Sequence, residues 1–492
     1  MSSIDYLRLL QLAAPETFLT LTGLMVLAVD LIVGRGSAPG TRIILSGSVA
    51  ATGCLLAAGG LFLLPVYGTF AAGMLVADPL TVLIKVSLVI LTLFTVLLAF
   101  SDAAPLADPG EYFALLLFAC VGMMFLTSAE HLLMVFLALE FTSLSLYILA
   151  AFNKQTPHST EAGIKYFLFG SISAAFMLFG LSLVYGVTGS VQLPEVAAGL
   201  ARAGNDPLAL VALVMIAMGF GFKVAAVPFH LWAPDVYQGA PIPSAALIAS
   251  GSKVASFFVF AKVVVIGFGG APAAVGSGAA PVWVLLLGIM AAVSMILGNL
   301  AALVQVSVRR LLAFSAIAHA GYMLLGILAG TEGFGPLVYY VITYGLATVG
   351  AFGVVSIVQA RTGSDRLCDF AGFHRRFPVL AFCMLIFMLS LAGIPPLAGF
   401  FGKFYVFAAA VKAGSLALFI LALATSTVSL FYYLQVLKQI YVGETADASH
   451  WEPVPITVSV ALLAMAFGVT LLGCFPDLLL NRITIALRIT GF

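Results

Sequence analysis

The chain has few charged residues for its length. Of its 492 residues only 8% are Asp, Glu, Lys or Arg, whereas 62% are hydrophobic. A soluble domain carries about 25% charged residues. A chain this apolar would not stay in water, so we expect it to lie in a lipid bilayer. Its net charge of +1 gives no support for a nucleic acid as partner.

The five cysteines are scattered, and no two lie within three residues of each other. Iron–sulfur clusters and structural zinc sites usually need closely spaced thiolates, so neither is predicted. The sequence has no P-loop, and no GxGxxG motif lies in a strand–helix setting. We therefore expect no cofactor and no metal ion on this chain.

Long apolar runs fill nearly the whole sequence, and their connections are short. A run of about 20 apolar residues crosses a bilayer as a helix. Fourteen such runs lie at residues 15–34, 42–64, 79–100, 111–128, 131–152, 161–186, 208–237, 241–267, 279–304, 309–330, 334–360, 377–410, 414–441 and 454–475. The prediction is an all-α integral membrane protein with about 14 transmembrane helices and no hydrophilic domain.

The basic residues of the connections orient the chain, because cytoplasmic loops are enriched in Lys and Arg. With both termini outside, the inner loops hold ten basic residues and the outer segments five, three of them in the terminal tails. No basic stretch precedes the first run, so we expect it to be retained as a span. The predicted location is a bacterial cytoplasmic membrane, with both termini in the periplasm.

The bases inside the spans are lysines only, because all twelve arginines lie in loops or at span ends. Arginine keeps its proton in a protein, whereas a buried lysine can release it. A proton path needs groups that alternate between the two states, so the choice of lysine indicates proton handling. Lys262 is expected to snorkel to the interface, the role of Lys85 stays undecided because its span has no other charged residue, and Asp30 is expected to reach water. The other lysines within spans are Lys165, Lys223, Lys253 and Lys403.

One acid, Glu140, lies deep in the fifth run. A carboxylate at the centre of a bilayer costs several kcal/mol, about 2.5–3.5 on insertion scales, unless it is paired or neutralised. Its nearest partner along the chain is Lys165, one span later. We predict a Glu140–Lys165 pair whose opening and closing shifts proton affinity elsewhere, with a static buried pair as the alternative.

The seventh and twelfth runs are overlong and interrupted by proline. Pro228 follows Lys223 by five residues, and the pair Pro395–Pro396 precedes Lys403. Proline removes a backbone donor and breaks the helix. Backbone freed in this way is tolerated at membrane depth only inside protein or beside water. Two broken helices with a nearby lysine therefore indicate an ion path.

Two blocks of the chain resemble each other. Glu140 follows His131-Leu-Leu at the same distance as His319 follows Arg310-Leu-Leu. Each block has five spans, and an odd number gives the blocks opposite orientations, which is the inverted-repeat plan of transporters. The predicted units are 1–110, the first repeat 111–267, the second repeat 279–441, and 454–492 with the last span.

The ionisable side chains within the spans form a predicted polar row near the middle of the membrane. Lys253 belongs to it because its small neighbours allow close packing and room for water. The row consists of Glu140, Lys165, Lys223, Lys253, His319 and Lys403. His230 and Asp235, which follow the first break, are additional candidates.

Residues 227–241, 310–322 and 389–403 resemble the antiporter-like membrane subunits of respiratory complex I, and the resemblance covers almost the whole chain. The same superfamily contains the multisubunit Na⁺/H⁺ antiporters. Three features resemble the N type. These are the stretch Pro-Asp-Val-Tyr-Gln-Gly-Ala-Pro, a lysine at position 403 where the M type has glutamate, and an end after fourteen spans without the long lateral helix of the L type.

The resemblance implies a role for each group of the row. Glu140 and Lys165 would be the coupling ion pair, and Lys223 the central proton carrier. Lys253 would connect the carrier to the second repeat. From Lys253 the proton would reach His319 and Lys403, and Lys403 would be the terminal exchange site.

The resemblance also implies the setting in which the chain works. It would be a proton-translocating subunit of an NADH:quinone oxidoreductase, and electrons would pass from NADH to quinone through other subunits. Its neighbours would be subunit M on one side and the quinone-end membrane subunits on the other. Two alternatives are a subunit that exchanges Na⁺ for H⁺ and a scaffold that has lost transport, against which the intact row argues.

Overall fold

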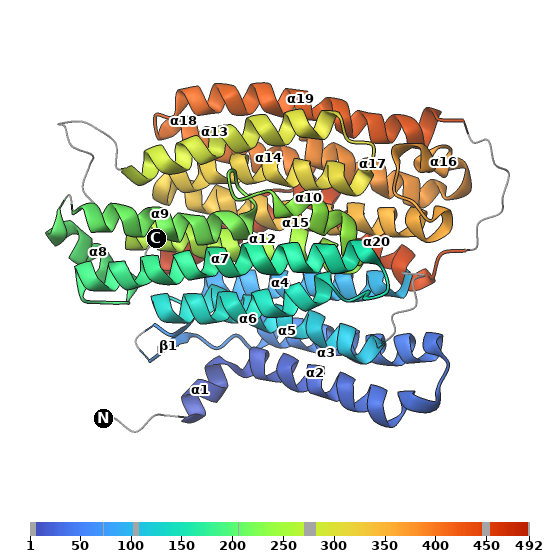
Figure 1. The fold of residues 1–492 in the computed structure, drawn as a ribbon, viewed down its shortest axis with the longest axis horizontal. Coiled ribbons are helices and arrows are strands. Elements are labelled where there is room, and N and C mark those ends of the chain that lie inside the picture. Colours follow the sequence, from blue (N-terminus) through green and yellow to red (C-terminus); the bar gives the residue numbers. More distant parts are fainter. Residues whose placement is uncertain are drawn as a thin grey trace.

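Helices that run along one common direction make up nearly the whole molecule (Figure 1). The structure is a computed structural model, and it describes residues 6–71, 73–101, 108–204, 206–269, 282–444 and 453–490. In these ranges thirteen helices are long and apolar enough to span a bilayer. A shorter apolar helix, α17 (Pro378–Ala392), is followed by α18 (Ala398–Lys412), and together they form a broken span. The predicted all-α membrane fold is confirmed.

Each predicted apolar run corresponds to one of these spans. Six of the spanning helices begin at a proline, because the fixed φ of proline suits the first helical position. The remaining spans are α2 (Ala14–Ile32), α3 (Pro39–Leu63), α4 (Pro79–Leu98), α5 (Pro109–Ser128), α6 (Leu132–Ala150), α7 (Pro157–Thr188), α9 (Pro207–Val224), α11 (Ile242–Ala249) with α12 (Gly251–Lys262) and a π-helical turn (Val263–Gly267), α13 (Val282–Leu303), α14 (Val308–Leu328), α15 (Gly330–Thr362), α19 (Leu416–Val442) and α20 (Ile456–Cys474).

Short elements cap the two ends of the bundle. They are α1 (Tyr6–Leu12), the hairpin β1 (Gly68–Phe70) and β2 (Leu75–Ala77), α8 (Leu193–Ala203), α16 (Phe373–Arg376), α21 (Asp477–Thr490) and three 3₁₀ turns at Gly34–Gly36, Ala99–Ser101 and Leu367–Phe370. The short helix α10 (Trp232–Gly239) lies within the bundle instead (Figure 1). Helix α1, β1 and α8 lie toward the same end of the bundle in Figure 1, whereas α16 lies at the other.

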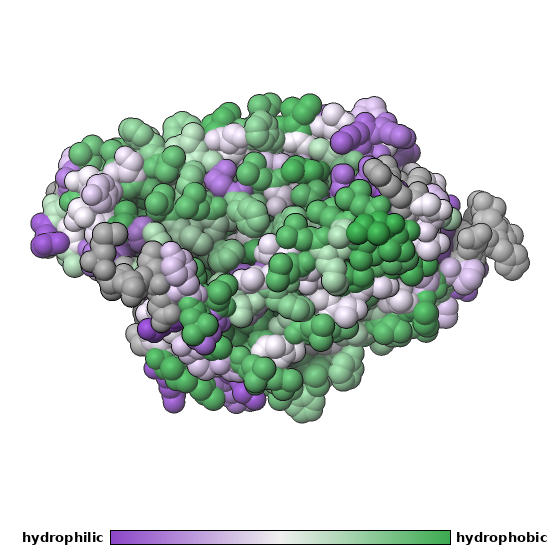
Figure 2. Space-filling model, turned by 90° about the horizontal axis from the view of Figure 1, so that it is seen from below, coloured by the Kyte–Doolittle hydropathy of each residue, from purple (hydrophilic) through white to green (hydrophobic). Residues whose placement is uncertain are grey.

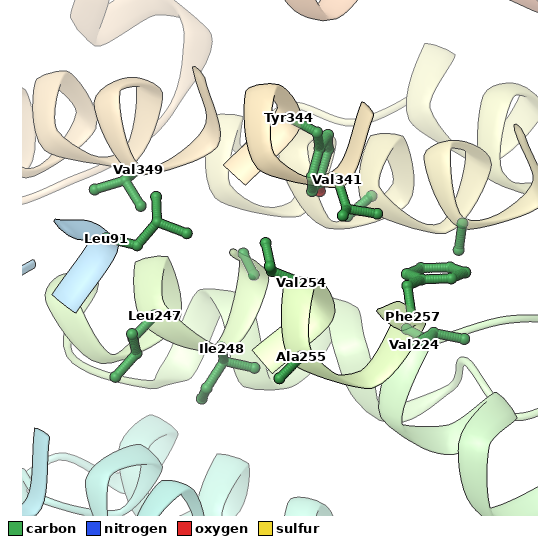
Figure 3. Packing of buried hydrophobic residues seen from close by; sticks show 14 of the residues in the cluster. Leu91, Val224, Leu247, Ile248, Val254, Ala255, Phe257, Val341, Tyr344 and Val349 are labelled. Atoms are coloured by element: carbon green, nitrogen blue, oxygen red, sulfur yellow. The ribbon is translucent and has the colours of Figure 1, made fainter. Parts of the chain in front are cut away.

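The core of the bundle is formed by α11–α12, α14 and α15, each 94% buried along its spanning window. Figure 3 shows this packing, where Val254 of α12, Leu91 of α4 and Tyr344 of α15 point into one interface. The outer helices α2, α3, α7 and α19 are only about one third buried. Figure 2 shows a mainly hydrophobic flank, with hydrophilic residues gathered toward the ends of the molecule. The exposed sides suit contact with lipid or with another membrane protein.

Both predicted helix breaks are confirmed. Helix α9 ends at Val224, where Ala225 adopts a left-handed conformation with φ of 56°, and the helix resumes only at Trp232. Helix α17 ends at Ala392, and Gly393 has a φ of 89°. The structure adds a third interruption that the sequence analysis did not predict, at Ser250 between α11 and α12.

The two long helices α7 and α15 end in the same way, which supports the predicted repeats. Each ends in Thr-Gly-Ser with a left-handed glycine, and in each the threonine hydroxyl exchanges hydrogen bonds with the serine backbone. A bridge then ties the next segment to the residue that precedes α6 or α14; the bridges are His131–Gln192 and Ser307–Arg366. The elements that follow, α8 and the turn before α16, lie at opposite ends of the bundle (Figure 1). The exact repeat boundaries stay a prediction.

Two charges near the N-terminus behave differently from expectation. Asp30 does not reach water: it is 6% exposed, and Arg42 donates to it through Nε at 3.0 Å and Nη2 at 2.6 Å. Lys85 has a partner that the sequence analysis missed, since its Nζ lies 2.6 Å from Oε1 of Glu16. Glu16 stands only two residues into the first predicted run, so it was not recognised as an intramembrane acid. Both members of this pair are fully buried.

Removing one member of the Glu16–Lys85 pair is expected to destabilise the protein strongly. Lys85→Met leaves the Glu16 carboxylate buried without its cation, and such a loss costs about 3–5 kcal/mol. The double variant Lys85→Met, Glu16→Gln removes both charges and should recover most of that loss. Thermal unfolding of the detergent-solubilised protein measures both. Equal melting temperatures for the single and the double variant would contradict this account.

Candidate functional site

Buried ionisable side chains line the interior of the bundle beside the two helix breaks. The structure places Lys223 in the last turn of α9, Lys253 in the first turn of α12, and Lys403 in the second turn of α18. His319 lies in the middle of α14. All four are at most 4% exposed. The described part of the chain therefore buries four of the six predicted row members deeply.

Lys223 lies beside a small cavity and among tyrosine rings. Its Nζ is 5.7 Å from the ring centroids of both Tyr147 and Tyr166. Among the described residues no atom accepts a hydrogen bond from it. Glu140 lines the same cavity, and its Oε1 is likewise buried without a hydrogen-bond partner. The cavity has room for about one water molecule, so Lys223 and Glu140 share a polar space within an otherwise apolar wall.

The predicted direct pair between Glu140 and Lys165 is wrong. Lys165 Nζ instead lies 2.6 Å from Glu161 Oε1 and 2.5 Å from Asp235 Oδ2, and its side chain is 36% exposed. Helix α7 faces the cavity with residues such as Gly170. Lys165 points elsewhere because it lies ~140° around the helix from that glycine, at 100° per residue. Spacing along the chain did not reveal which face of α7 meets α6.

Asp235 ties three helices together at one end of the bundle. It accepts from Lys165 of α7 and, through Oδ1 at 2.8 Å, from Arg310 of α14. Arg310 also donates to Gln238 Oε1 at 3.1 Å. Asp235 itself lies on α10, the short helix after the first break. The other additional candidate, His230, is partly buried, and its Nδ1 has no hydrogen-bond partner in the described ranges.

The backbone freed at the first break is satisfied by side chains. In an unbroken helix the N–H of residue 228 would bond to the carbonyl of Val224, but proline has no N–H. Trp232 Nε1 donates to the carbonyl of Phe222 at 3.0 Å, and the backbone N–H of Val227 donates to Ser294 Oγ at 2.9 Å. The break is thus held in one shape within the protein.

Lys253 is anchored to the backbone of α14. Its Nζ donates to the carbonyl of Ala316 at 2.5 Å and lies 5.7 Å from the ring centroid of Tyr344. Lys253 follows the interruption at Ser250 by three residues. Its position places an amine between the two predicted repeats, because α12 belongs to the first and α14 to the second.

His319 has a tyrosine hydroxyl on each ring nitrogen. Nδ1 is 2.7 Å from Tyr340 Oη, and Nε2 is 3.1 Å from Tyr433 Oη, which in turn hydrogen-bonds to Ser315. The sequence analysis missed both tyrosines. Within an apolar run a tyrosine looks like any other core aromatic residue, and its hydroxyl gives no sign of its partner.

Lys403 occupies the hydrogen-bonding position that Pro396 leaves empty. A residue with an N–H at position 396 would bond to the carbonyl of Ala392 in a continuous helix. Here Lys403 Nζ donates to that carbonyl at 2.9 Å and to Ser426 Oγ at 3.0 Å. A Cβ atom on Gly393 would lie 3.1 Å from Lys403 Cδ. The break therefore provides both the acceptor and the space for the amine.

A further group of neutral polar side chains connects α13, α14 and α19. Asn299 Nδ2 donates to Tyr322 Oη at 2.9 Å, and Tyr432 Oη donates to Asn299 Oδ1 at 3.1 Å. Tyr322 donates on to Thr425, and its ring centroid is 5.2 Å from Lys403 Nζ. Hydroxyl and amide groups of this kind can donate and accept, so they suit the transfer of protons next to the lysine.

The lysines of the interior differ in their partners. Lys223, Lys253 and Lys403 form no ion pair with any carboxylate in the described ranges. The amines of Lys253 and Lys403 contact neutral oxygen atoms and aromatic rings, whereas Lys223 shares its cavity with the Glu140 carboxylate. Lys262 was expected to snorkel and does not; it is 1% exposed and pairs with Glu130 at 2.8 Å. A buried cation without a counter-charge is costly, so the amines of Lys253 and Lys403 are suited to release a proton. The described residues contain no group of three His, Cys, Asp or Glu that could hold a metal ion.

Comparison with known proteins gives a consistent result. The sequence profile of a family described as NADH:quinone oxidoreductase/Mrp antiporter, transmembrane, matches residues 129–429. The chain is 50% identical to NADH-quinone oxidoreductase subunit N 2 of Acidobacterium capsulatum, over 98% of this chain and 99% of the relative. It is 38% identical to NADH-quinone oxidoreductase subunit N of Desulforamulus reducens, over 94% of this chain and 95% of the relative.

Solved structures show the same likeness. A chain of respiratory complex I from Thermus thermophilus with bound aureothin superposes with a TM-score of 0.77 at 33% identity, covering 95% of this chain and 98% of that one. A chain of the Mrp complex from Dietzia sp. DQ12-45-1b gives a TM-score of 0.82 at 20% identity, covering 97% of each chain. At 20% identity, the similarity to the Mrp chain shows a shared fold alone.

Proposed function

Because the chain belongs to the NADH:quinone oxidoreductase/Mrp antiporter membrane family, and within it to the subunit N proteins, we propose that its buried lysines are the path along which it moves protons. It is an antiporter-like, proton-translocating membrane subunit. The proposal concerns which side chains carry the protons. One observation supports it above the others: three buried amines lie beside helix breaks or interruptions, and none of them forms an ion pair with a carboxylate in the described ranges.

The geometry suggests a role for each member of the path. Lys223 takes a proton in the cavity that it shares with Glu140, where the charge of the carboxylate favours the protonated amine. Lys253 bridges the two repeats through the carbonyl of Ala316. His319, with a hydroxyl on each ring nitrogen, can accept a proton on one side as it gives one up on the other. Lys403 completes the path at the second break.

Lys165 and Asp235 would act as positioning residues and not as carriers. Their contacts with Arg310 hold α7, α10 and α14 in a fixed relation. A shift at α7 would therefore reach both the segment after the first break and the helix that carries His319. This route replaces the proposed direct coupling between Glu140 and Lys165.

The proposal also covers the setting of the chain. It would work as a non-redox subunit of an NADH:quinone oxidoreductase, in which NADH and a quinone react on other subunits and this chain holds no cofactor. Its partners would be subunit M and the quinone-end membrane subunits. The location would be a bacterial cytoplasmic membrane with both termini in the periplasm, and the basic connections support that orientation.

The transported ion separates this proposal from Na⁺/H⁺ exchange. A Na⁺ site needs several oxygen ligands, as hard cations do, whereas the amines of Lys253 and Lys403 each contact only one or two oxygen atoms. NADH-driven proton uptake into inverted membrane vesicles should therefore be the same with and without Na⁺. A requirement for millimolar Na⁺ would refute proton transfer along these lysines as the function.

Asp235→Asn is expected to lower NADH:quinone turnover by about threefold to tenfold, or roughly 0.7–1.4 kcal/mol of barrier. Asparagine keeps the size and one acceptor, but the negative charge between Lys165 and Arg310 is lost. The matched control is Glu161→Gln, because Glu161 also contacts Lys165 but is 56% exposed, and exposed pairs contribute little. Equal activity of the two variants in membranes with equal amounts of assembled complex would refute the positioning role of Asp235.

A further inference from the structure

Helix α10, which follows the first break, contacts both predicted repeats although it carries none of the proposed proton carriers. Its eight residues, Trp232–Gly239, span ~12 Å along the helix axis, and it lies within the bundle (Figure 1). One end of α10 reaches the backbone beside Lys223, and the other reaches the first turn of α14, the helix that carries His319. A short helix therefore lies between a carrier of the first repeat and one of the second.

Trp232 connects the first end of α10 to the surroundings of Lys223. Its indole Nε1 donates at 3.0 Å to the carbonyl of Phe222, the residue before Lys223. Its ring stacks on that of Tyr166 with a centroid distance of 4.5 Å, and the Tyr166 ring centroid is 5.7 Å from Lys223 Nζ. Trp232 is buried, and a close-packed interior passes a shift on to the neighbouring groups. A movement of Trp232 therefore displaces groups that lie next to the amine.

Arg309 connects the other end of α10 to the second repeat. In a continuous helix the N–H of residue 241 would bond to the carbonyl of Tyr237, but Pro241 has no N–H. Arg309 Nε donates to that carbonyl at 2.8 Å instead, and Nη2 donates to the carbonyl of Ala240. Its Nη1 donates to Gln359 Oε1 of α15 at 3.2 Å. The guanidinium group thus joins the end of α10 to α14 and α15.

This connection is stiffer than the contacts among Lys165, Asp235 and Arg310. A guanidinium group holds its donors in a planar fork and keeps its proton, so the connection persists while protons pass through the interior. Arg309 is 4% exposed, whereas the other three side chains are 31–36% exposed. Solvent weakens exposed contacts, so the buried contacts of Arg309 hold α10 more firmly.

We propose that α10 is a rigid link between Lys223 and α14, with Trp232 and Arg309 as the positioning residues at its two ends. This inference rests on the proposed function, because Lys223 must carry protons for its position to matter. When the first turn of α14 shifts, Arg309 moves α10 with it, and Trp232 displaces the groups beside the amine. The link works in reverse as well, so a change at Lys223 reaches the helix that carries His319.

The competing explanation is two local supports that act independently, and a double-mutant cycle in the whole membrane complex separates the two. Trp232→Phe keeps an aromatic ring on α10 but removes the indole N–H. The carbonyl of Phe222 then still accepts from the N–H of Ala225 at 3.1 Å, so no acceptor is orphaned and the complex should assemble. Arg309→Lys keeps the charge but loses the planar fork.

The cycle is measured as NADH-driven quinone reduction and proton uptake, normalised to assembled complex. A rigid link predicts that each single variant lowers kcat by about threefold to tenfold with an unchanged KM for quinone, and that the double variant is no slower than the slower single one. Independent supports at opposite ends of a helix have additive free energies, so their effects on the rate multiply to about tenfold to a hundredfold.

Two matched controls make the same substitutions elsewhere. Trp283→Phe changes a partly buried tryptophan at the start of α13, and Arg375→Lys changes an exposed arginine of α16. Both should assemble and work as the wild type does. If Arg309→Lys does not assemble, Pro241→Ala takes its place in the cycle. Alanine supplies the N–H that competes with Arg309 for the carbonyl of Tyr237 and leaves every charge in place.

A double variant that is about threefold or more slower than the slower single variant overturns the link, and so does a wild-type rate in either single variant. Failure of Trp232→Phe, of the double variant, or of both Arg309→Lys and Pro241→Ala to assemble also overturns it, since these residues would then support folding. Lys223→Ala is measured in parallel. If Lys223→Ala is impaired and the two ends act independently, the link alone is wrong. If Lys223→Ala is fully active, the proposed path is wrong as well.

Discussion

Lys223→Ala is expected to lower NADH-driven quinone reduction and proton uptake by about tenfold or more, the scale of a lost proton-transfer group. The amine is buried, lies beside the Glu140 cavity, and has no hydrogen-bond acceptor among the described residues. Its loss removes no hydrogen bond that the structure shows, so assembly should survive. The fall in rate should then report transport and not misfolding. The measurement is turnover and proton uptake in inverted membrane vesicles, normalised to assembled complex.

Lys223→Arg distinguishes a carrier from a structural cation. Arginine keeps the positive charge near Glu140 but does not release its proton, so the rate should stay close to that of the alanine variant. A structural cation would be replaced well by arginine and badly by alanine. An assembled Lys223→Arg complex that turns over at the wild-type rate would show that Lys223 is not a titrating carrier, and the proposed path would fail.

Lys403→Met should also reduce both activities by about tenfold or more. Here the loss has a second component, because the carbonyl of Ala392 then has no N–H from Pro396 and no amine to bond to. An unsatisfied buried acceptor costs about 1–3 kcal/mol, so a lower thermal stability should accompany the lower rate. Lys412→Met, on the same helix but exposed, should change neither. Full activity of Lys403→Met would exclude Lys403 as a carrier.

Pro396→Ala tests the same position with the lysine in place. Alanine supplies the N–H that proline lacks, and this N–H can compete with Lys403 for the carbonyl of Ala392. If the amine is positioned by the break, the variant should lose activity although no titratable group has changed. Retained activity would mean that Ser426 and the neighbouring side chains suffice to position Lys403.

The spans and both proline breaks could be predicted from the sequence because their causes are local. Apolar length fixes a span, and proline disfavours a helix interior, as at Pro228 and Pro395–Pro396, although Pro336 lies within the continuous helix α15. The partner of Glu140 could not be predicted in this way, because it depends on how α6, α7 and α9 are rotated about their axes. Spacing along the chain leaves the facing sides of α6, α7 and α9 open, and the packing of the bundle selects them.

Other features of the site were missed for different reasons. Tyr340 and Tyr433 are neutral and apolar enough to look like core residues until His319 is seen between them. Lys262 ends its helix, where lysines usually reach water, and only the connection that carries Glu130 shows why it does not. The repeated Thr-Gly-Ser at the ends of α7 and α15 was available in the sequence. This repeated tripeptide marks the two halves of the chain more clearly than the similar spacing that leads to Glu140 and to His319.

The neutral surroundings of Lys253 and Lys403 have an electrical consequence. A proton that moves within a fixed ion pair changes the local charge little, because the counter-charge stays beside it. A proton that arrives at an amine held only by carbonyl and hydroxyl oxygens brings a full uncompensated charge into the field of the membrane. Each charge carried across that field is worth about 2.3 kcal/mol per 100 mV. The occupancy of these two amines must therefore depend on the membrane voltage, and a rising voltage will oppose the arrival of a proton at these lysines.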